Sequence, residues 1–166
     1  TYGPQNLFVP SSQYFELAEW SRINAAYTYK NLKIVNEVLA NAHQPELYAR
    51  LRDILLRETG HKILNEVEQV KIALTDKSEV RRILDYIAGK PEVKAVREAF
   101  DASIGKDVGK ISASLRECLK LAAVKAEDVG LVILTGGSTE IPLINQTVRN
   151  IFTCAAFSSG NKLSSV

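Results

Sequence analysis

The sequence predicts an α/β fold of the α+β kind, with a helical lobe and a β-hairpin joined to a βαβ remnant. The first observation is the apolar run at 131–134, which breaks into two glycines and then into a proline-led amphipathic stretch. That order is typical of a buried strand, a tight turn and a helix. The second is that most of the preceding chain repeats its apolar residues at helical spacing.

The first half of the chain predicts helices separated by short breaks. Residues 1–30 predict an irregular lead-in to a first helix near Gln13, and residues 31–42 predict a short helix that ends at His43-Gln44-Pro45. A long helical pattern covers residues 45–76, and Gly60 in its middle either kinks or splits it. The residues of its apolar stripe are Leu47, Leu51, Ile54, Leu55, Ile63, Leu64, Val67, Val70 and Leu74. We expect this segment to lie beside the helix at 97–122, with Leu64, Val67 and Val70 buried.

Residues 78–96 match two patterns at once. Val80, Ile83, Leu84 and Ile87 fit a helix template, yet the segment is short and three of these residues are β-branched. The sequence Ala-Gly-Lys-Pro at 88–91 supplies turn chemistry before a second extended stretch at 92–96. The family resemblance described below decides for a β-hairpin.

The second half predicts one long helix followed by a βαβ unit. The helix covers 97–122, the strands cover 128–134 and 154–157, and the helix at 141–152 connects them in parallel. The family resemblance described below implies that residues 1–122 form a helix-rich mobile lobe, with the β-hairpin near 78–96, and that residues 123–166 form part of an adjoining lobe. The residues that should point inward on the long helix are Phe100, Ile104, Val108, Ile111, Leu115, Cys118 and Leu119.

Composition is that of a domain with no nucleic-acid or membrane function. The chain has 166 residues, of which 46% are hydrophobic and 24% are charged. Its net charge is +2, and its basic residues are interspersed with acidic ones. No apolar stretch approaches the roughly 20 residues of a membrane span, and no signal peptide opens the chain. Cys118 and Cys154 are too few for a disulfide framework or a metal set. We therefore expect a cytoplasmic protein in which Cys118 is a small buried hydrophobe.

Two motifs resemble one protein family. GGSTEIPLI at 136–144 is similar to the adenosine-loop motif GGS-T-x-I-P of the Hsp70 chaperones, members of the actin-like ATPase superfamily. LNEVEQVKIALTD at 64–76 resembles the Hsp70 helix E-x-x-K-x-x-L-S/T, which faces the adenosine from the other side of the cleft. Arg97 to Asp101 is similar to the family's R-x-x-F-E/D. The resemblance covers residues 60–152 well and implies an actin-like ATPase fold.

The resemblance implies a nucleotide site with two walls. Glu68, Lys71 and Thr75, at i, i+3 and i+7 of one helix, would meet the ribose hydroxyls and an adenine nitrogen. Gly136, Gly137 and Ser138 would form the opposite wall, with their backbone against the nucleoside. The plainer alternative is a solvated helix face with an i, i+3 ion pair, and a turn that needs glycine for its own geometry.

Two positions depart from the family. Typical Hsp70s have arginines after the lysine and after GGST, and these arginines sandwich the adenine. This chain has Ile72 and Glu140 there. Ile72 still offers apolar cover, whereas Glu140 cannot stack as a cation. We expect weaker nucleotide binding or a different clamp, in a divergent member of the family.

The phosphate-binding hairpins of the superfamily, D-x-G-T-T and D-I-G-G-G-T, do not occur in these residues. We therefore expect a fragment, truncated at both ends, from the later part of a nucleotide-binding domain, and we assign no catalytic or metal-binding residue. The intact parent would bind ATP or ADP with Mg²⁺, hydrolyse ATP and act on client polypeptides, while the fragment would bind no cofactor. The alternatives are a helical protein-interaction module without nucleotide binding and part of an actin-like small-molecule kinase.

Overall fold

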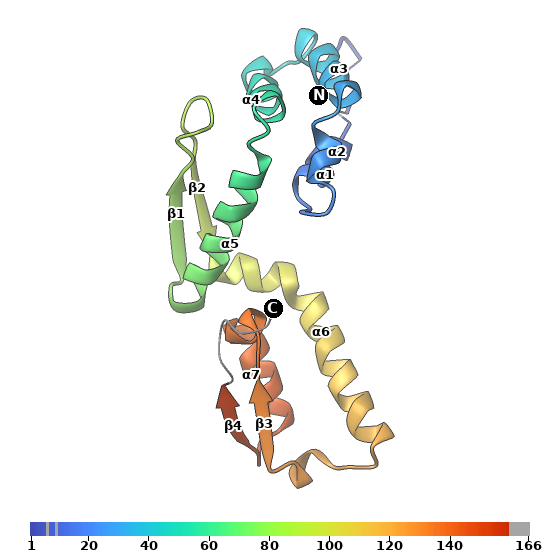
Figure 1. Cartoon of the computed structure of the whole chain (residues 1–166), viewed down its shortest axis with the longest axis vertical. Helices are drawn as coiled ribbons and strands as arrows, with labels where there is room; N and C mark the ends of the chain where they lie inside the picture. Colours follow the sequence, from blue (N-terminus) through green and yellow to red (C-terminus); the bar gives the residue numbers. More distant parts are fainter. Residues whose placement is uncertain (6, 9, 160–166) are drawn as a thin grey trace. The chain divides into compact units, whose positions relative to one another are not determined.

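The computed structural model describes residues 1–5, 7–8 and 10–159, which divide into two compact units (Figure 1). The first unit contains Thr1–Ala73 and Val80–Lys94, and the second contains Leu74–Glu79 and the chain from Ala95 onward. Helices and two small two-stranded sheets make up the described chain, which confirms the predicted α/β class. The predicted division of the parent's lobes at residue 122 stays a prediction.

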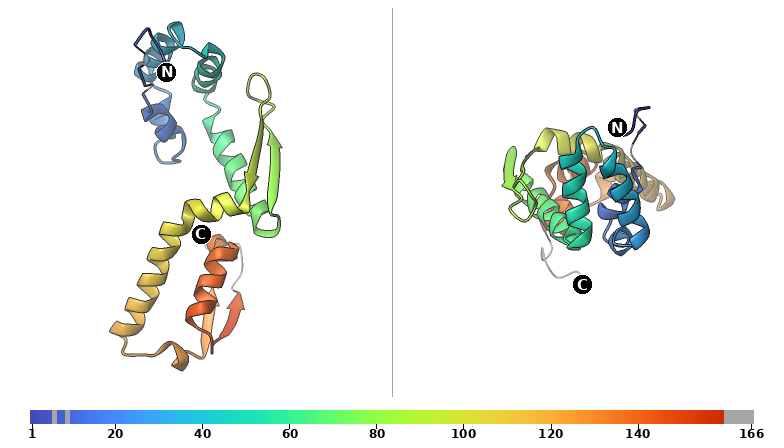
Figure 2. Two further views of the ribbon diagram at one scale, coloured as in Figure 1. Left: turned by 180° about the vertical axis from the view of Figure 1, so that it is seen from behind. Right: turned by 90° about the horizontal axis from the view of Figure 1, so that it is seen from above.

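The helices of the first unit follow one another through short connections (Figure 2). They are α1 (Ser12–Leu17), α2 (Ile23–Ala26), α3 (Tyr29–Ala40), α4 (Pro45–Leu56) and α5 (Gly60–Asp76), whose last turn belongs to the second unit. Helices α3 and α4 pack against each other. Their shared core contains the buried residues Ala26, Val35, Leu51 and Leu55.

A buried polar network connects the first three helices. The side chain of Asn31 donates to Glu16 Oε2 at 2.7 Å and to the carbonyl oxygen of Ala25 at 2.8 Å. Gln13 Nε2 donates to Asn31 Oδ1 at 3.4 Å, and both side chains are almost fully buried. Because buried amides need partners, this network fixes how α1 lies against α2 and α3.

Helices α4 and α5 are separate, so the pattern at 45–76 is split and not merely kinked. Glu58 has a φ of 51°, which ends α4, and Thr59 N donates back to the carbonyl oxygen of Ile54 at 3.1 Å. Gly60 then begins α5 in a tight site. A Cβ added there would lie 2.7 Å from both Leu17 Cδ2 and Tyr27 Oη.

The apolar stripe along α4 and α5 is only partly core. Leu64 is buried as predicted, and Leu51, Leu55 and Leu74 are buried too, but Leu47 is 47% exposed and Val67 is 58% exposed. The prediction that Val67 is core is therefore wrong, because Val67 lines an open groove of the first unit. Val70 is half-buried. The predicted packing of this stripe on residues 97–122 concerns both units and stays a prediction.

The predicted hairpin is confirmed by β1 (Glu79–Ile83) and β2 (Glu92–Val96), which pair with each other. The turn between them has positive φ angles at Gly89 (80°) and Lys90 (44°). The buried residues Val80 and Leu84 face inward. Of the four residues that fit the helix template, only Val80 and Ile83 lie in β1, and Ile83 is 64% exposed, so the helical spacing does not correspond to one buried face here.

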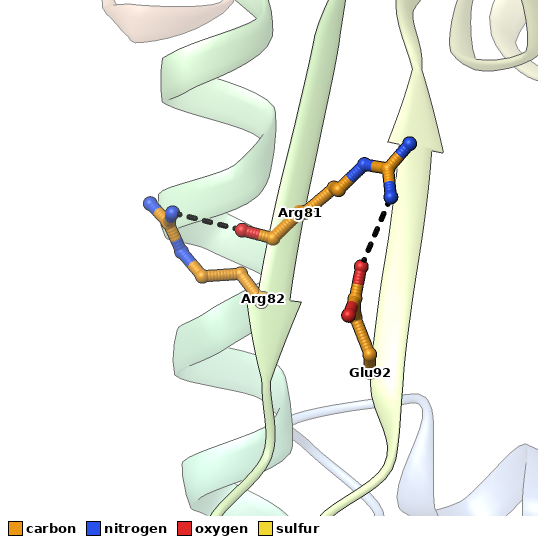
Figure 3. A network of polar contacts seen from close by, with 3 residues as sticks. All are labelled: Arg81, Arg82 and Glu92. Atoms are coloured by element: carbon orange, nitrogen blue, oxygen red, sulfur yellow. Dashed lines mark hydrogen bonds and ion pairs between the residues drawn. The ribbon is translucent and has the colours of Figure 1, made fainter.

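Charged side chains connect the two strands of the hairpin to each other and connect β1 to α5. Arg81 on β1 reaches Glu92 on β2, with Nη1 at 3.3 Å from Oε1 (Figure 3). Arg82 donates to the Arg81 carbonyl oxygen at 3.3 Å, and its Nε lies 3.6 Å from Glu66 Oε2 of α5. The Arg81–Glu92 pair is exposed and the Arg82–Glu66 pair is half-buried, and ion pairs this open to solvent contribute only about 0–1 kcal/mol each.

The second unit contains the predicted βαβ arrangement. Its elements are α6 (Arg97–Leu121), a short turn η1 (Ala126–Asp128), β3 (Leu131–Leu134), η2 (Gly137–Glu140), α7 (Pro142–Ile151) and β4 (Ala156–Ser159). Strands β3 and β4 are parallel, with Leu131 opposite Ala156 and Leu134 opposite Ser159. Strand β3 is shorter than predicted because residues 126–128 form the turn η1.

Helix α6 packs against α7 through two apolar clusters. The first joins Val108 of α6 to Ile141 and Ile144 at the start of α7. The second joins Leu115 and Leu119 of α6 to the buried residues Leu134, Val148, Ile151 and Phe152. Ile111 and Cys118 are exposed, so the predictions that they point inward are wrong. None of the helices in the described part of the chain is both long and apolar enough to span a membrane.

A buried residue and an exposed residue of the α4–α5 stripe should differ in their effect on the free energy of unfolding. Leu55→Ala removes a side chain that is 1% exposed, and we expect it to lower the free energy of unfolding by about 2–5 kcal/mol. Val67→Asp alters an exposed position and should cost under about 1 kcal/mol. Urea denaturation of both variants measures this. Equal losses would show that Val67 is core after all.

Candidate functional site

The turn after β3 has a backbone that requires glycine at one position. Gly136 has φ 88° and ψ 151°, a region that residues with a Cβ rarely adopt. Thr139 closes the turn, since its N–H and its hydroxyl both donate to the Gly136 carbonyl oxygen, at 3.1 and 2.7 Å. The double glycine therefore ends the strand and begins η2 in one fixed conformation.

The far side of the turn is anchored to the core. Ile141 is buried against Val108 and Ile144, and Pro142 occupies the first turn of α7, where its missing N–H has no cost. Asn145 Nδ2 donates to the Thr139 carbonyl oxygen at 3.3 Å. The turn is thus held from both α6 and α7, and its backbone is presented on a rigid frame.

Gly137, unlike Gly136, has no backbone conformation that requires glycine. Its φ is not positive, and a Cβ added to it would meet nothing within 4 Å. The described structure therefore gives no steric or conformational reason for glycine at 137. Ser138 beside it is exposed, and its hydroxyl has no partner among the described residues. Open backbone with a neighbouring hydroxyl fits a flat polar ligand such as a nucleoside.

Helix α5 carries the other predicted wall. Glu68 Oε2 and Lys71 Nζ form an i, i+3 ion pair, and Lys71 is half-buried while Glu68 is exposed. Ile72 is 53% exposed, so it offers an apolar surface next to Lys71. An exposed helical ion pair contributes only about 0.2–0.5 kcal/mol, so both groups remain able to exchange partners with a ligand.

The end of α5 is held by a residue whose role the sequence did not reveal. Arg97, at the start of α6, donates from Nε to the Leu74 carbonyl oxygen at 2.8 Å and from Nη2 to the Thr75 carbonyl oxygen at 3.0 Å. Its backbone N–H donates to the Ser78 carbonyl oxygen at 2.9 Å. The last carbonyls of a helix lack internal partners and favour a cation, so Arg97 fixes the turn that carries Thr75.

The predicted site residues belong to both units. Glu68, Lys71 and Ile72 lie in the first unit, whereas Thr75, Gly136–Ser138 and Glu140 lie in the second. Within the second unit, Thr75 and Glu140 are half-buried. That the two walls face one nucleoside stays a prediction.

Residues 1–5, 7–8 and 10–159 contain no group of three or more His, Cys, Asp or Glu side chains that could hold a metal ion.

Comparison with known proteins identifies the family. The family model described as Hsp70 protein matches residues 33–162. The chain belongs to the Hsp70 family. It is 37% identical over 103 residues to a chaperone protein HscA homolog of Shewanella sp. (strain ANA-3), which covers 61% of this chain. A chaperone protein HscA homolog of Shewanella putrefaciens is 39% identical over 103 residues, or 60% of this chain.

A third relative extends the similarity. The chaperone protein HscA homolog of Shewanella baltica is 34% identical over 115 residues, or 69% of this chain. The chain spans only 16–18% of the length of these three relatives. Membership of the Hsp70 family confirms the resemblance drawn from the two motifs, and it leaves the small-molecule kinase interpretation without support.

Arg97 should matter more to stability than its partly exposed position indicates. Arg97→Met removes two charge-assisted hydrogen bonds, and we expect a loss of about 1.5–3 kcal/mol in the free energy of unfolding. Arg116→Met, at an exposed position on the same helix, is the matched control. Urea denaturation compares them, and similar small effects from both would mean that the Arg97 contacts do not hold α5.

The two glycines of the turn should respond differently to the same substitution. Gly136→Ala forces a Cβ into a positive-φ conformation and should cost about 1–3 kcal/mol of stability. Gly137→Ala should change stability by no more than about 0.5 kcal/mol, because the space there is open. Thermal and urea unfolding of the 166-residue chain measure both. A large loss from Gly137→Ala would show that the fold itself needs this glycine.

Proposed function

We propose that this chain is the later part of the nucleotide-binding domain of a divergent Hsp70-type chaperone and supplies the adenosine side of its ATP cleft. The observation that carries the proposal is Gly137, an exposed glycine that the local backbone does not require. It lies at the carboxyl end of β3, which is where open α/β sheets bind their ligands. A ligand that rests on the backbone explains a glycine that the fold leaves unexplained.

Each wall has a defined task in this proposal. The backbone of Gly136 and Gly137 lies flat against the nucleoside, and the Ser138 hydroxyl offers one hydrogen bond. On α5, Glu68 accepts from a ribose hydroxyl and Lys71 donates to one, after exchanging the weak ion pair that joins them. Thr75 offers its hydroxyl to an adenine nitrogen, and Arg97 holds the turn on which Thr75 lies.

The clamp on the adenine differs from the usual one. Ile72 covers one face with exposed apolar surface, and Glu140 replaces a cation on the other. Without two guanidinium groups, the stacking and cation–π contribution of roughly 0.5–2 kcal/mol at each position is absent. We therefore propose an adenosine site of lower affinity than one that has both arginines.

The rest of the site lies outside this chain. ATP or ADP would bind with Mg²⁺, which neutralises phosphate charge when bound, and the groups that hold it would come from other parts of the longer protein. The parent would hydrolyse ATP and act on client polypeptides in the cytoplasm, as a chaperone.

Nucleotide binding tests the assignment of the two walls. The 166-residue chain alone should bind ATP weakly or not at all and show no ATPase activity, because phosphate contacts supply much of the affinity. In the longer protein, Gly137→Val should abolish ATP binding by filling the space of the ligand. Lys71→Ala should weaken binding by about 1–3 kcal/mol, the scale of a charged hydrogen bond. Isothermal titration calorimetry measures each affinity.

Gly105→Ala is the matched control, since a Cβ at Gly105 on α6 also meets nothing within 4 Å. It should bind ATP like the wild type. Micromolar binding by the chain alone would mean that a complete site lies within it. Wild-type affinity in both site variants would favour the helical protein-interaction module instead.

A further inference from the structure

The first unit contains an apolar groove that the proposed nucleotide site does not use. Its volume is about 570 Å³, and its walls come from α1, α4, α5 and the turn between β1 and β2. The buried residues Leu51, Leu64 and Ile87 form the floor. The rim residues Tyr14, Leu47 and Val67 are 47%, 47% and 58% exposed, so large apolar side chains remain in water. Such a patch is typical of an interaction site.

The groove follows the helical stripe recognised in the sequence. On α4 its lining includes Leu47, Leu51 and Ile54, and on α5 it continues with Leu64 and Val67. Residues at i, i+3, i+4 and i+7 form one continuous face of a helix. A row of this kind, open to solvent and flanked by other elements, matches the apolar face of an added amphipathic helix.

One charge on the groove is uncompensated. Arg50 lines the groove and is half-buried, yet it has no hydrogen-bond or ion-pair partner among the described residues. Its guanidinium lies against the hairpin turn, where a Cβ added to Gly89 would come within 2.9 Å of Nη2.

Arg50 is the one charged residue among the described residues that line the groove, and no acidic residue lines it. The groove therefore offers apolar surface together with one available cation, and its best complement is apolar and acidic.

We propose that this groove binds an amphipathic helix of a partner protein that carries apolar residues at i, i+3, i+4 and i+7 and a carboxylate facing Arg50. The apolar face covers Leu47 and Val67 and removes them from water. The carboxylate forms a charge-assisted pair with the guanidinium, which sets the register of the bound helix. The partner is thus defined by its apolar spacing and by the sign of one flanking charge.

Charge reversal in the 166-residue chain tests this proposal. The probe is a fluorescently labelled alanine-based helix of about fifteen residues, with leucine at that spacing and one flanking glutamate. Its twin has lysine in place of the glutamate. Fluorescence anisotropy should show that the wild type prefers the glutamate peptide by about fivefold or more. Arg50→Glu should reverse the preference, an effect that a loss of structure cannot produce.

Val67→Gln should reduce binding of the glutamate peptide about fivefold or more, since it places a polar group on the apolar rim. Ile83→Gln and Arg116→Glu are the controls, at an exposed apolar residue on β1 and an exposed cation on α6, and both should bind like the wild type.

Four results would overturn the proposal. They are no binding of either peptide, equal binding of both peptides, self-association of the chain that Val67→Gln abolishes, and failure of a longer protein carrying this chain to bind the peptide. The third would make the groove an interface between copies, and the fourth would show that the rest of the protein covers it.

Discussion

The two hydrogen bonds from the Arg97 guanidinium to the carbonyls of Leu74 and Thr75 fix the last turn of α5 within the second unit. The backbone N–H of the same residue donates to Ser78, so one residue holds the end of one helix, the base of the hairpin and the start of the next helix. A helix end with unpaired carbonyls is costly when partly buried, and a planar cation with several donors is well suited to satisfy it. The position of Thr75 depends on this contact.

In the proposed function, the two glycines of one turn have separate roles, one in the structure and one toward the ligand. Gly136 is required by its positive φ, and the Thr139 contacts stabilise the conformation it allows. Gly137 has no such requirement, so in the proposed function its missing side chain serves the ligand. The helix wall is less specialised, because the Glu68–Lys71 pair would form on any solvated helix. The glycine turn is therefore the stronger part of the functional argument.

Sequence patterns predicted the elements well and their burial less well. The strand–glycine–helix order at 131–151 follows from local chemistry, namely β-branched residues and turn residues, and is confirmed. The hairpin, where the residues matched two patterns, was predicted from the family resemblance and is also confirmed. Periodicity shows which residues share a face, but it cannot show whether a neighbour covers that face. For this reason Val67 and Cys118, which belong to apolar stripes, were predicted buried and are exposed.

Other features depend on contacts that no local pattern contains. The break after α4 comes from Glu58, a residue type that seldom takes a positive φ, and the Asn31 network joins residues up to 18 positions apart. The candidate site also divides into residues that the sequence could identify and contacts that it could not. The motif residues could be named from the sequence, whereas the contribution of Arg97 to the Thr75 turn required coordinates.

Photocrosslinking would test the central claim most directly. A longer protein that carries this chain would be irradiated with an ATP analogue whose azide is attached to the adenine, and the labelled peptides would be mapped by mass spectrometry. The account predicts that labels fall within residues 64–76 and 135–144 and that excess ATP removes them. Labelling that ATP competes away but that lies entirely outside these two segments would contradict it.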